Sequence, residues 1–291
     1  MSCIAIIELE SGQVLLSSSV CDEAIAALED GRILFLPRYH FPLSNPENGL
    51  FSATISGTAK NVSYNPASKE LRGTVATGQN AELLREMLTR FSDFAQDLVD
   101  RLLPSYRSGL IQGRTSFRPQ EIEDRAISWR KDDTRLHIDS FPSAPTQGKR
   151  ILRVFSNVDP SGRSRIWRMG EPFEQMAARF LPSIKRPLPF SSAALQLLNI
   201  TRSRRTEYDH IMLQLHDRMK SDARYQAEVQ QSKQEFPAGC TWIAFADQVA
   251  HAGISGQNLL EQTFLVPLAQ LRDEAKAPLC VLQRLTGRKL G

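Results

Sequence analysis

The stretch from Asp132 to Pro142 carries the side chains best suited to chemistry. His137 and Asp139 lie two positions apart, and on an extended backbone side chains at i and i+2 leave the same face of the strand. An imidazole and a carboxylate on one face make half of a metal site. One more His from a distant strand would complete the two-His-one-carboxylate set that binds Fe(II) and leaves positions open for reaction.

The favoured third ligand is His251. It lies just beyond a buried-strand pattern, Cys240–Ala246, that opens with a Pro-Ala-Gly turn, which is where a jelly-roll barrel presents its far metal ligand. By contrast, His40 precedes a Pro-rich loop, and His210 and His216 are spaced to lie on different faces of a helix. Because a His-X-Asp triplet is common by chance, an alternative in which these His are surface or hydrogen-bonded residues stays open.

Arg153 is a candidate for binding an anion. It interrupts the apolar strand pattern Ile151–Val158, and a guanidinium inside a buried strand needs an anionic partner. That partner is either the carboxylate of a ligand or an internal Asp or Glu, and the pattern alone does not separate the two.

Composition indicates an ordinary globular chain. The 291 residues are 41% hydrophobic and 23% charged. The net charge of +4 is too small to indicate nucleic-acid binding by itself. Four cysteines without paired spacing predict free thiols in a reducing compartment and no thiolate metal cluster; they are Cys3, Cys21, Cys240 and Cys280. Acidic residues interrupt the first apolar run, so we expect neither a signal nor a spanning segment, and a cytoplasmic location.

Hydrophobic periodicity predicts the remaining elements. Short strands are expected at Cys3–Leu9, Val14–Leu16, Ile33–Leu36, Cys240–Ala246 and Leu259–Val266, with β-type residues also between Leu110 and Asp139. Helices are expected at Cys21–Leu28, Asn80–Leu103, Glu171–Leu181 and Thr206–Ala227. Residues 42–78 are expected to form loops with one weak strand.

These elements and the placing of His251 predict an α+β protein with a jelly-roll (cupin-like) core and flanking and inserted helices; the resemblance described below implies that this core is a double-stranded β-helix. We expect a single catalytic domain, residues 1–291. Its parts are N-terminal strands and loops (1–78), a supporting helix (79–104) and the jelly-roll core (110–270), with a helical insertion at about 171–235. The insertion accounts for the long separation of Asp139 and His251.

Four stretches together resemble the Kdo hydroxylases. They are Asp133–Ser143, Ile151–Phe155, Trp242–His251 and Leu259–Phe264, and the resemblance spans most of the chain in length and order. It implies an Fe(II)- and 2-oxoglutarate-dependent dioxygenase with a double-stranded β-helix. Such enzymes hydroxylate the 3-position of 3-deoxy-D-manno-oct-2-ulosonic acid (Kdo) in the lipid A inner core, forming the sugar Ko.

The resemblance also implies roles for particular residues. His137, Asp139 and His251 would be the iron ligands, and Arg153 would bind the distal carboxylate of 2-oxoglutarate, with O2 as co-substrate. Many oxygenases of the superfamily carry an Arg about a strand's length after the last His. Here Arg272 is too far along, which favours Arg153.

A Kdo-containing lipid A substrate is anionic, so the mouth of the site is expected to be cationic. The preferred pocket residues are Arg118 and Trp167. Further basic residues near the half-site are Arg114, Arg135, Arg163, Arg165 and Arg168. A second group, Arg202, Arg204 and Arg205, is suited to anionic headgroups, so we expect peripheral contact with the cytoplasmic face of the inner membrane and no nucleic-acid partner.

Two alternatives compete with this interpretation. One keeps the iron and 2-oxoglutarate and changes the substrate to a protein side chain or a small metabolite. The other is a cupin-like binding module without catalysis, or an Arg-rich nucleic-acid-binding protein, in which His137→Ala would leave activity unaffected or only destabilise the fold. The sequence lacks the stacking aromatic and basic motifs of nucleic-acid modules.

Overall fold

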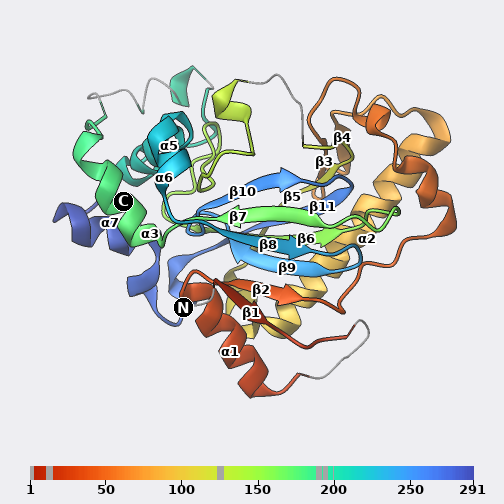
Figure 1. Ribbon diagram of the computed structural model, residues 1–291, viewed down its shortest axis with the longest axis horizontal. Coiled ribbons are helices and arrows are strands. Elements are labelled where there is room, and N and C mark those ends of the chain that lie inside the picture. Colours follow the sequence, from red (N-terminus) through yellow and green to blue (C-terminus); the bar gives the residue numbers. More distant parts are fainter. Residues whose placement is uncertain (1–2, 11–15, 123–127, 188–191, 193–195, 199) are drawn as a thin grey trace.

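The computed structural model describes residues 3–10, 16–122, 128–187, 192, 196–198 and 200–291. Two β-sheets form its centre (Figure 1). In the eight-stranded sheet the order is β1 (Ile4–Ile6), β2 (Ile33–Leu36), β9 (Thr241–Phe245), β6 (Arg150–Asn157), β11 (Leu259–Val266), β5 (Ile111–Arg118), β3 (Val62–Asn65) and β4 (Glu70–Arg72). In the three-stranded sheet the order is β10 (His251–Ser255), β7 (Arg165–Met169) and β8 (Ser232–Phe236).

Strand alternation decides what lies between the sheets. On β6, Leu152 and Val154 belong to the core beneath the helices, while Arg153 and Phe155 leave the opposite face. Phe155 packs edge-on against Trp167 of β7, with ring centroids 5.0 Å apart, and stacks on Trp242 of β9 at 5.2 Å. An aromatic core therefore joins the two sheets next to Arg153.

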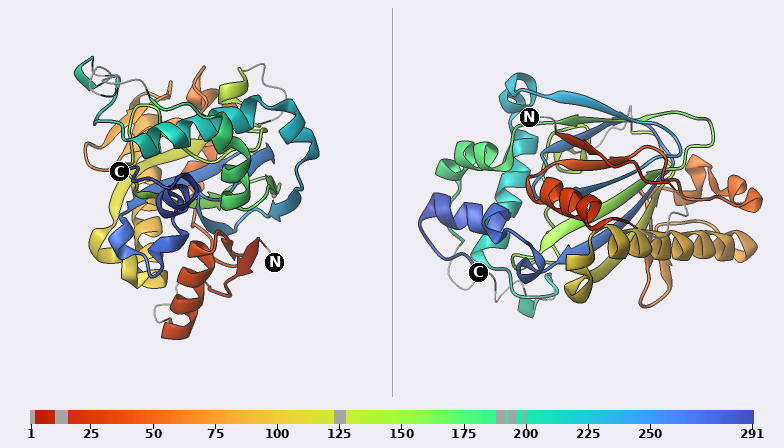
Figure 2. Two further views of the ribbon diagram at one scale, coloured as in Figure 1. Left: turned by 90° about the vertical axis from the view of Figure 1, so that its left-hand side faces the viewer. Right: turned by 90° about the horizontal axis from the view of Figure 1, so that it is seen from below.

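Two helices cover the outer face of the large sheet. They are α1 (Ser18–Glu29) and α2 (Gly78–Leu102), which lie across that face in the right panel of Figure 2. Apolar residues recur along α2 at helical spacing and are buried, among them Leu84, Leu88 and Phe91. The helix ends where Pro104 begins a 3-10 turn.

The remaining helices form a layer at one end of the sheets (Figure 1). They are α3 (Phe173–Phe180), α5 (Glu207–Ser221), α6 (Ala223–Glu228) and α7 (Pro278–Thr286). Their apolar faces share a core with Leu136 and Ile138. The segment that carries His137 and Asp139 is therefore anchored by the residues that alternate with them.

The predicted elements were largely confirmed, with several differences. Strands β7, β8 and β10 and helix α7 were not predicted, and β8 lies in the range expected for the helical insertion. The helix expected at Thr206–Ala227 breaks at Asp222, whose side chain accepts a hydrogen bond from Tyr225 N and caps α6. The single weak strand expected in residues 42–78 is the hairpin of β3 and β4. Between Leu110 and Asp139 only β5 and the single bridge at His137 have β structure among the described residues.

Residues 14, 15 and 123–127, which belong to the predicted β-type segments, lie outside the described residues. Among those that are described, no helix is both long and apolar enough to cross a membrane.

Candidate metal centre

His137, Asp139 and His251 come together, as the sequence predicted. Main-chain hydrogen bonds pair His137 with His251 in both directions, at 3.0 and 2.9 Å. An isolated bridge therefore joins the segment that carries His137 and Asp139, here called the ligand segment, to β10. Asp139 N donates to Ala246 O at 2.7 Å. One ligand atom from each of the three side chains lies within 4.8 Å of the others, so the three converge on one point.

The hydrogen bonds of the two His rings leave one nitrogen of each for a metal. His137 Nδ1 lies 2.7 Å from Arg135 O, and His251 Nδ1 lies 2.8 Å from Val249 O. A carbonyl oxygen only accepts, so each Nδ1 carries the proton and each Nε2 offers a lone pair. Burial lowers the pKa of both rings, helped at His137 by the neighbouring His251. Neutral imidazole is the form that binds metals.

A buried ion pair positions the loop between β9 and β10. Arg150 Nε donates to Asp247 Oδ2 at 2.8 Å, and Arg150 Nη2 donates to Gln248 Oε1 at 2.6 Å. Gln248 Nε2 in turn donates to Glu29 O at 3.2 Å. The loop is thereby fixed between β6 and α1, and His251 follows directly after it.

Arg153 lies beside the carboxylate of Asp139. Its Nε is 2.9 Å from Asp139 Oδ2, but the contact is not aligned as a hydrogen bond, so both atoms keep unused hydrogen-bonding capacity. Its Nη1 donates to Glu261 Oε1 at 2.7 Å. Of the two partners that the sequence left open for Arg153, internal carboxylates are the ones present in this structure.

A chain of ion pairs continues from Glu261. Arg118 Nη2 donates to Glu261 Oε2 at 2.7 Å, and Arg118 Nη1 donates to Asp133 Oδ2 at 3.1 Å. Asp133 also pairs with Lys60. At Lys60 burial prevails over the pairing with Asp133 and lowers the pKa. Burial also opposes the charges of the other three groups, but their partners outweigh it: the pKa of Arg118 is raised, and those of Asp133 and Glu261 are lowered. All three groups are therefore charged at neutral pH.

These groups line a small cavity of about 100 Å³. Trp167 forms one wall and stacks on the His251 ring, with centroids 4.8 Å apart and planes at 22°. Arg165, two residues earlier on β7, lines the same cavity. The complete lining is Lys60, Arg118, Asp133, His137, Asp139, Arg153, Phe155, Arg165, Trp167, His251, Gly253, Leu259 and Glu261.

The basic residues expected around the mouth separate into two groups. Arg118 and Arg165 line the cavity. The other four bond elsewhere: Arg114 with Ser63, Arg135 with Asp132, Arg163 with Asp159, and Arg168 with Thr134.

Sequence reasoning did not single out Lys60, Asp133, Gly253 or Glu261. Glu261 carried a signal, because a carboxylate inside the apolar strand Leu259–Val266 needs a cation just as Arg153 needs an anion. His216, which its helical spacing had set aside, packs edge-on against His137 with ring centroids 5.6 Å apart.

Comparison with known proteins identifies the family. The family model described as 3-deoxy-D-manno-oct-2-ulosonic acid (Kdo) hydroxylase matches residues 8–289. The chain belongs to the Kdo hydroxylase family. No curated protein matches it.

Solved structures of one Kdo hydroxylase resemble this family member over almost the whole chain. The Kdo hydroxylase KdoO, a non-heme Fe(II) alphaketoglutarate dependent dioxygenase, in complex with cobalt(II), matches with a TM-score of 0.96 and 44% identity, covering 99% of this chain and 97% of that one. Its complex with alphaketoglutarate and Fe(III) matches with a TM-score of 0.95, 44% identity and the same coverage. The resemblance and the double-stranded β-helix fold predicted from the sequence are thus confirmed.

Proposed function

We propose that this family member catalyses the Fe(II)- and 2-oxoglutarate-dependent hydroxylation of Kdo in the lipid A inner core, at the 3-position, forming Ko. The observation that carries the proposal is the convergence of two neutral imidazoles and one carboxylate inside a Kdo hydroxylase fold. Structures of KdoO contain alphaketoglutarate with Fe(III) and succinate with Fe(III). These are the co-substrate and the co-product that such a reaction requires.

The donor set fits Fe(II). The ion would be held on one side by Nε2 of His137, Nε2 of His251 and an oxygen of Asp139. Its other coordination positions would remain open for 2-oxoglutarate and O2. When bound, the iron supplies oxidative chemistry: 2-oxoglutarate becomes succinate and CO2, and one atom of O2 enters a C–H bond of the sugar. The chain supplies orientation through Arg135 O and Val249 O, which fix both imidazoles.

The charge of the cavity supports an anionic co-substrate. Four cationic side chains face three carboxylates in the lining, and a bound Fe(II) adds two positive charges. We propose Arg153 as a partner for the distal carboxylate of 2-oxoglutarate and Arg118 and Trp167 as contacts of the sugar. Because Arg153 and Arg118 already hold carboxylates of the protein, a ligand would have to share them.

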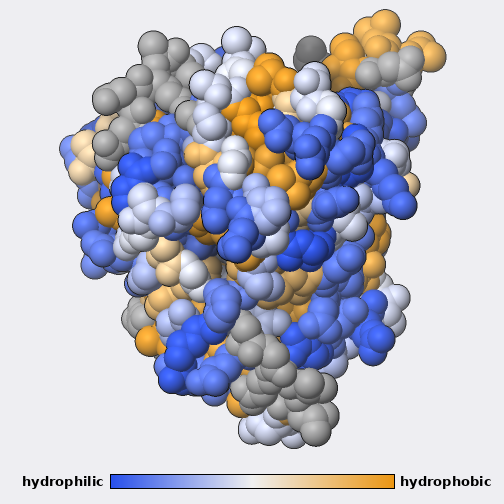
Figure 3. Space-filling model, turned by 90° about the vertical axis from the view of Figure 1, so that its right-hand side faces the viewer, coloured by the Kyte–Doolittle hydropathy of each residue, from blue (hydrophilic) through white to orange (hydrophobic). Residues whose placement is uncertain are grey.

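We also propose that the enzyme meets its lipid substrate at the surface of the inner membrane, on the cytoplasmic side. Leu197, Leu198 and Ile200 expose 84%, 68% and 53% of their surface, and Figure 3 shows apolar atoms projecting at the upper edge of the molecule. Arg202 and Arg204 follow and are exposed. Exposed apolar side chains beside Arg are suited to an anionic bilayer surface.

Two contacts tie this surface to the metal centre. Arg202 N donates to Ser143 O at 2.9 Å, and Arg205 Nη2 donates to Pro142 O at 2.8 Å. Both acceptors follow Asp139 closely in the chain. A membrane-bound orientation through residues 197, 198 and 200–205 would therefore place the ligand segment near the lipid.

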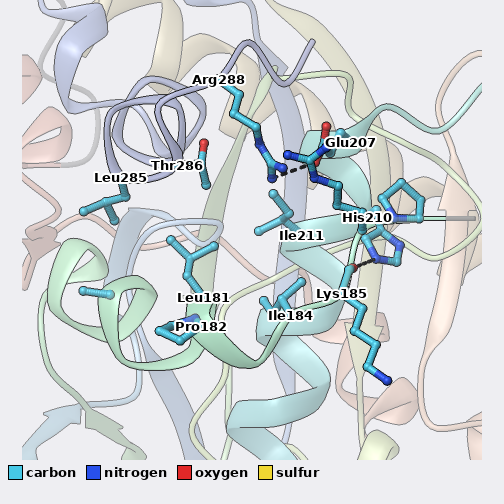
Figure 4. A pocket seen from close by; sticks show the side chains of 13 residues that line it. Leu181, Pro182, Ile184, Lys185, Glu207, His210, Ile211, Leu285, Thr286 and Arg288 are labelled. Atoms are coloured by element: carbon cyan, nitrogen blue, oxygen red, sulfur yellow. Dashed lines mark hydrogen bonds and ion pairs between the residues drawn. The ribbon is translucent and has the colours of Figure 1, made fainter.

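A cleft of about 440 Å³ adjoins the same region. In Figure 4, Leu181, Ile184 and Ile211 point into it from the helical layer. Cationic residues stand at its rim, among them Lys185 and Arg288, and Arg288 pairs with Glu207 at 2.7 Å. An apolar floor with a cationic rim suits an amphiphile with an anionic head, which describes lipid A.

The test of the proposed reaction uses Fe(II)-loaded enzyme, 2-oxoglutarate and O2, with and without Kdo-containing lipid A. We expect lipid-dependent succinate and a gain of one oxygen in the lipid by mass spectrometry, both absent in His137→Ala and Asp139→Ala. Succinate without modified lipid would keep the oxygenase and reject the substrate. Folded, iron-loaded protein that gives neither product would favour a binding module.

The membrane proposal has a separate test. Sedimentation with vesicles that contain anionic lipid, whose negative surface potential attracts basic residues, is compared for the wild type and Leu197→Ser/Leu198→Ser. We expect the double variant to lose most of its binding while its activity on detergent-solubilised lipid is unchanged. Equal sedimentation of both proteins would reject this surface.

A further inference from the structure

The cleft of about 440 Å³ in the helical layer, here called the apolar cleft, adjoins a second cleft of about 530 Å³, here called the cationic cleft. Pro187, Glu207 and His210 line both clefts. In Figure 4, Glu207, His210 and Arg288 lie together on one side of the apolar cleft. The cationic cleft begins on that side. Its wall also contains Gln147, Arg204, Arg205, Thr206, Lys289 and Leu290.

Five cations of the two clefts have no carboxylate partner in the described part of the chain. They are Lys185 and Arg186 in the apolar cleft and Arg204, Arg205 and Lys289 in the cationic cleft. Among the described lining residues the one carboxylate side chain is that of Glu207, and Arg288 holds it at 2.7 Å. The metal cavity differs, because its arginines Arg118 and Arg153 each contact two carboxylates.

Such a set of cations favours an anion with more than one charge. Walls of one sign around a concave surface concentrate the electric field and attract the opposite charge. A phosphate monoester carries about −1.5 to −2 charges at neutral pH and offers three strong acceptor oxygens. Arginine binds such a group with two parallel hydrogen bonds, and lysine binds it as a point charge. The cationic cleft therefore suits a phosphate monoester better than a single carboxylate.

Arg205 connects the cationic cleft to the ligand segment. Its Nη2 donates to Pro142 O at 2.8 Å, and its Nε is buried without a hydrogen-bond partner. Pro142 follows Asp139 by three residues, so their Cα atoms are at most about 11 Å apart. A head group of a few linked sugars covers such a distance. One ligand can therefore reach the metal centre and the cationic cleft at the same time.

We propose that the cationic cleft binds a phosphate monoester of an acylated sugar and that an acyl chain of the same molecule lies in the apolar cleft. The proposal rests on the proposed function and deepens it, because it assigns the part of the lipid that is held away from the metal. Leu181, Ile184 and Ile211 supply the apolar contacts. Arg204 and Lys289 are the cations with free side chains next to them.

The test compares the wild type with Arg204→Gln/Lys289→Gln. Both side chains are exposed and make no hydrogen bond or ion pair in the described part of the chain, so the variant should fold normally. The control is Lys69→Gln/Arg107→Gln, which removes one Lys and one Arg from exposed positions that line neither cleft. The two variants change the net charge equally.

The KM is measured for Kdo-containing lipid A in uncharged detergent, with the phosphates present and removed. Losing a charged hydrogen bond weakens binding about tenfold to a hundredfold, so we expect phosphate removal to raise the wild-type KM by that factor. Arg204→Gln/Lys289→Gln should raise the KM for the phosphorylated lipid similarly, and phosphate removal should then change it by less than about twofold. The control should behave like the wild type.

Three results would overturn the proposal. Phosphate removal could raise the KM by the same factor in the wild type and in Arg204→Gln/Lys289→Gln, and the cleft would then not bind the phosphate. The control could equal the cleft variant, and the effect would then be one of net charge. The cleft variant could be impaired on anionic vesicles alone, and its cations would then serve the bilayer surface.

Calorimetry separates this proposal from the proposed function. The probes are a phosphorylated, acylated disaccharide without Kdo, the same molecule without its phosphates, and inorganic phosphate. We expect the first probe to bind the wild type at least about tenfold more tightly than the other two and to lose this advantage in Arg204→Gln/Lys289→Gln. Inorganic phosphate that binds as tightly as the acylated probe would reject a lipid as the ligand.

The two failures give different results. If the first probe binds as expected but no Kdo lipid is hydroxylated, the proposed function fails and the phosphate site stands. If Kdo lipid is hydroxylated but the two acylated probes bind equally, the proposed function stands and the phosphate site is wrong.

Discussion

At the scale of single residues, the cavity is lined by a network of ion pairs with shared partners. Glu261 is buried between Arg118 and Arg153, with a contact of 2.7 Å to each. Arg153 continues to the ligand carboxylate of Asp139. Arg153, which lies beside the proposed ligand Asp139, is thus held from its other side by Glu261.

Glu261→Gln tests this network. It leaves two buried guanidinium groups short of one carboxylate, and breaking a buried pair costs about 3 to 5 kcal/mol of unfolding free energy. Urea unfolding of the metal-free protein measures the loss. The control is Glu235→Gln on β8, whose carboxylate is 57% exposed and pairs with Lys233, so a change below about 1 kcal/mol is expected. Equal effects of both changes would contradict the network.

The two ligand imidazoles give a pH dependence. Burial lowers the pKa of His137 and His251 in the folded state, while the unfolded chain keeps a value near 6.5. Below that pH the unfolded state binds protons that the folded state does not. Stability is therefore full above about pH 6.5 and falls below it, by up to about 1.4 kcal/mol per pH unit for each ring.

Urea unfolding in EDTA at pH 7.5, 6.5 and 5.5 checks this. The slope of His251→Gln below pH 6.5 should be shallower than that of the wild type, whereas His210→Gln should not change it, because His210 lies on α5 away from the cavity. If the free energy of unfolding falls with pH at the same slope in all three proteins, the rings of His137 and His251 do not cause the loss of stability below pH 6.5.

At the scale of elements, the sequence predicted the helices and strands whose apolar residues recur at a regular spacing or form a continuous run. Helix α2 repeats apolar residues at helical spacing, and the strand around Arg153 is apolar apart from a few polar positions, so both stand out. Strand β8 (Ser232–Phe236) is mostly polar and exposed and forms by pairing with β7. On β7 the inward series is Arg165, Trp167 and Met169; an inward Arg hides the alternation that marks a strand.

The ligand residues were predictable for a related reason. His137 and Asp139 alternate with Leu136 and Ile138, so one local pattern gives both the anchor and the ligands. Glu261, which Arg118 and Arg153 share, comes from a strand far away in sequence, and no local pattern encodes which charges meet. The sequence therefore predicted three side chains that converge in the structure, but not which carboxylates the cations of the cavity share.

The loop after β9 gives a prediction for an element. Asp247→Asn weakens the buried pair with Arg150 that fixes this loop, and His251 follows the loop directly. Changes to groups that orient metal ligands typically cost about 10- to 100-fold in metal affinity. Calorimetric Co(II) binding should show a loss in that range.

The matched control for that loop is Asp159→Asn. Asp159 is also buried and accepts hydrogen bonds from Ser161, but it follows β6 and does not line the cavity. We expect a loss of stability with Co(II) affinity unchanged. If Asp159→Asn weakened Co(II) as much as Asp247→Asn, the loss would reflect general destabilisation.

At the scale of the whole molecule, the metal centre lies where separate layers meet. His251 belongs to the small sheet, Arg153 beside Asp139 belongs to the large one, and Leu136 and Ile138 pack into the helical layer. An ion at this point would connect all three. Metal binding is then expected to stabilise global folding and not only the local loop.

Binding linkage fixes the size of that effect. At a free metal concentration of 100 times Kd the folded state gains about 2.7 kcal/mol, provided that the unfolded chain does not bind. Urea unfolding with Co(II) and with EDTA should differ by this amount in the wild type and in His210→Ala, and the difference should vanish in His251→Ala. If Co(II) moves a single unfolding transition as a whole to higher urea, the layers unfold together. If Co(II) moves only an early, partial transition, the ligand segment and β10 unfold independently of the sheets, and metal binding stabilises only that part of the structure.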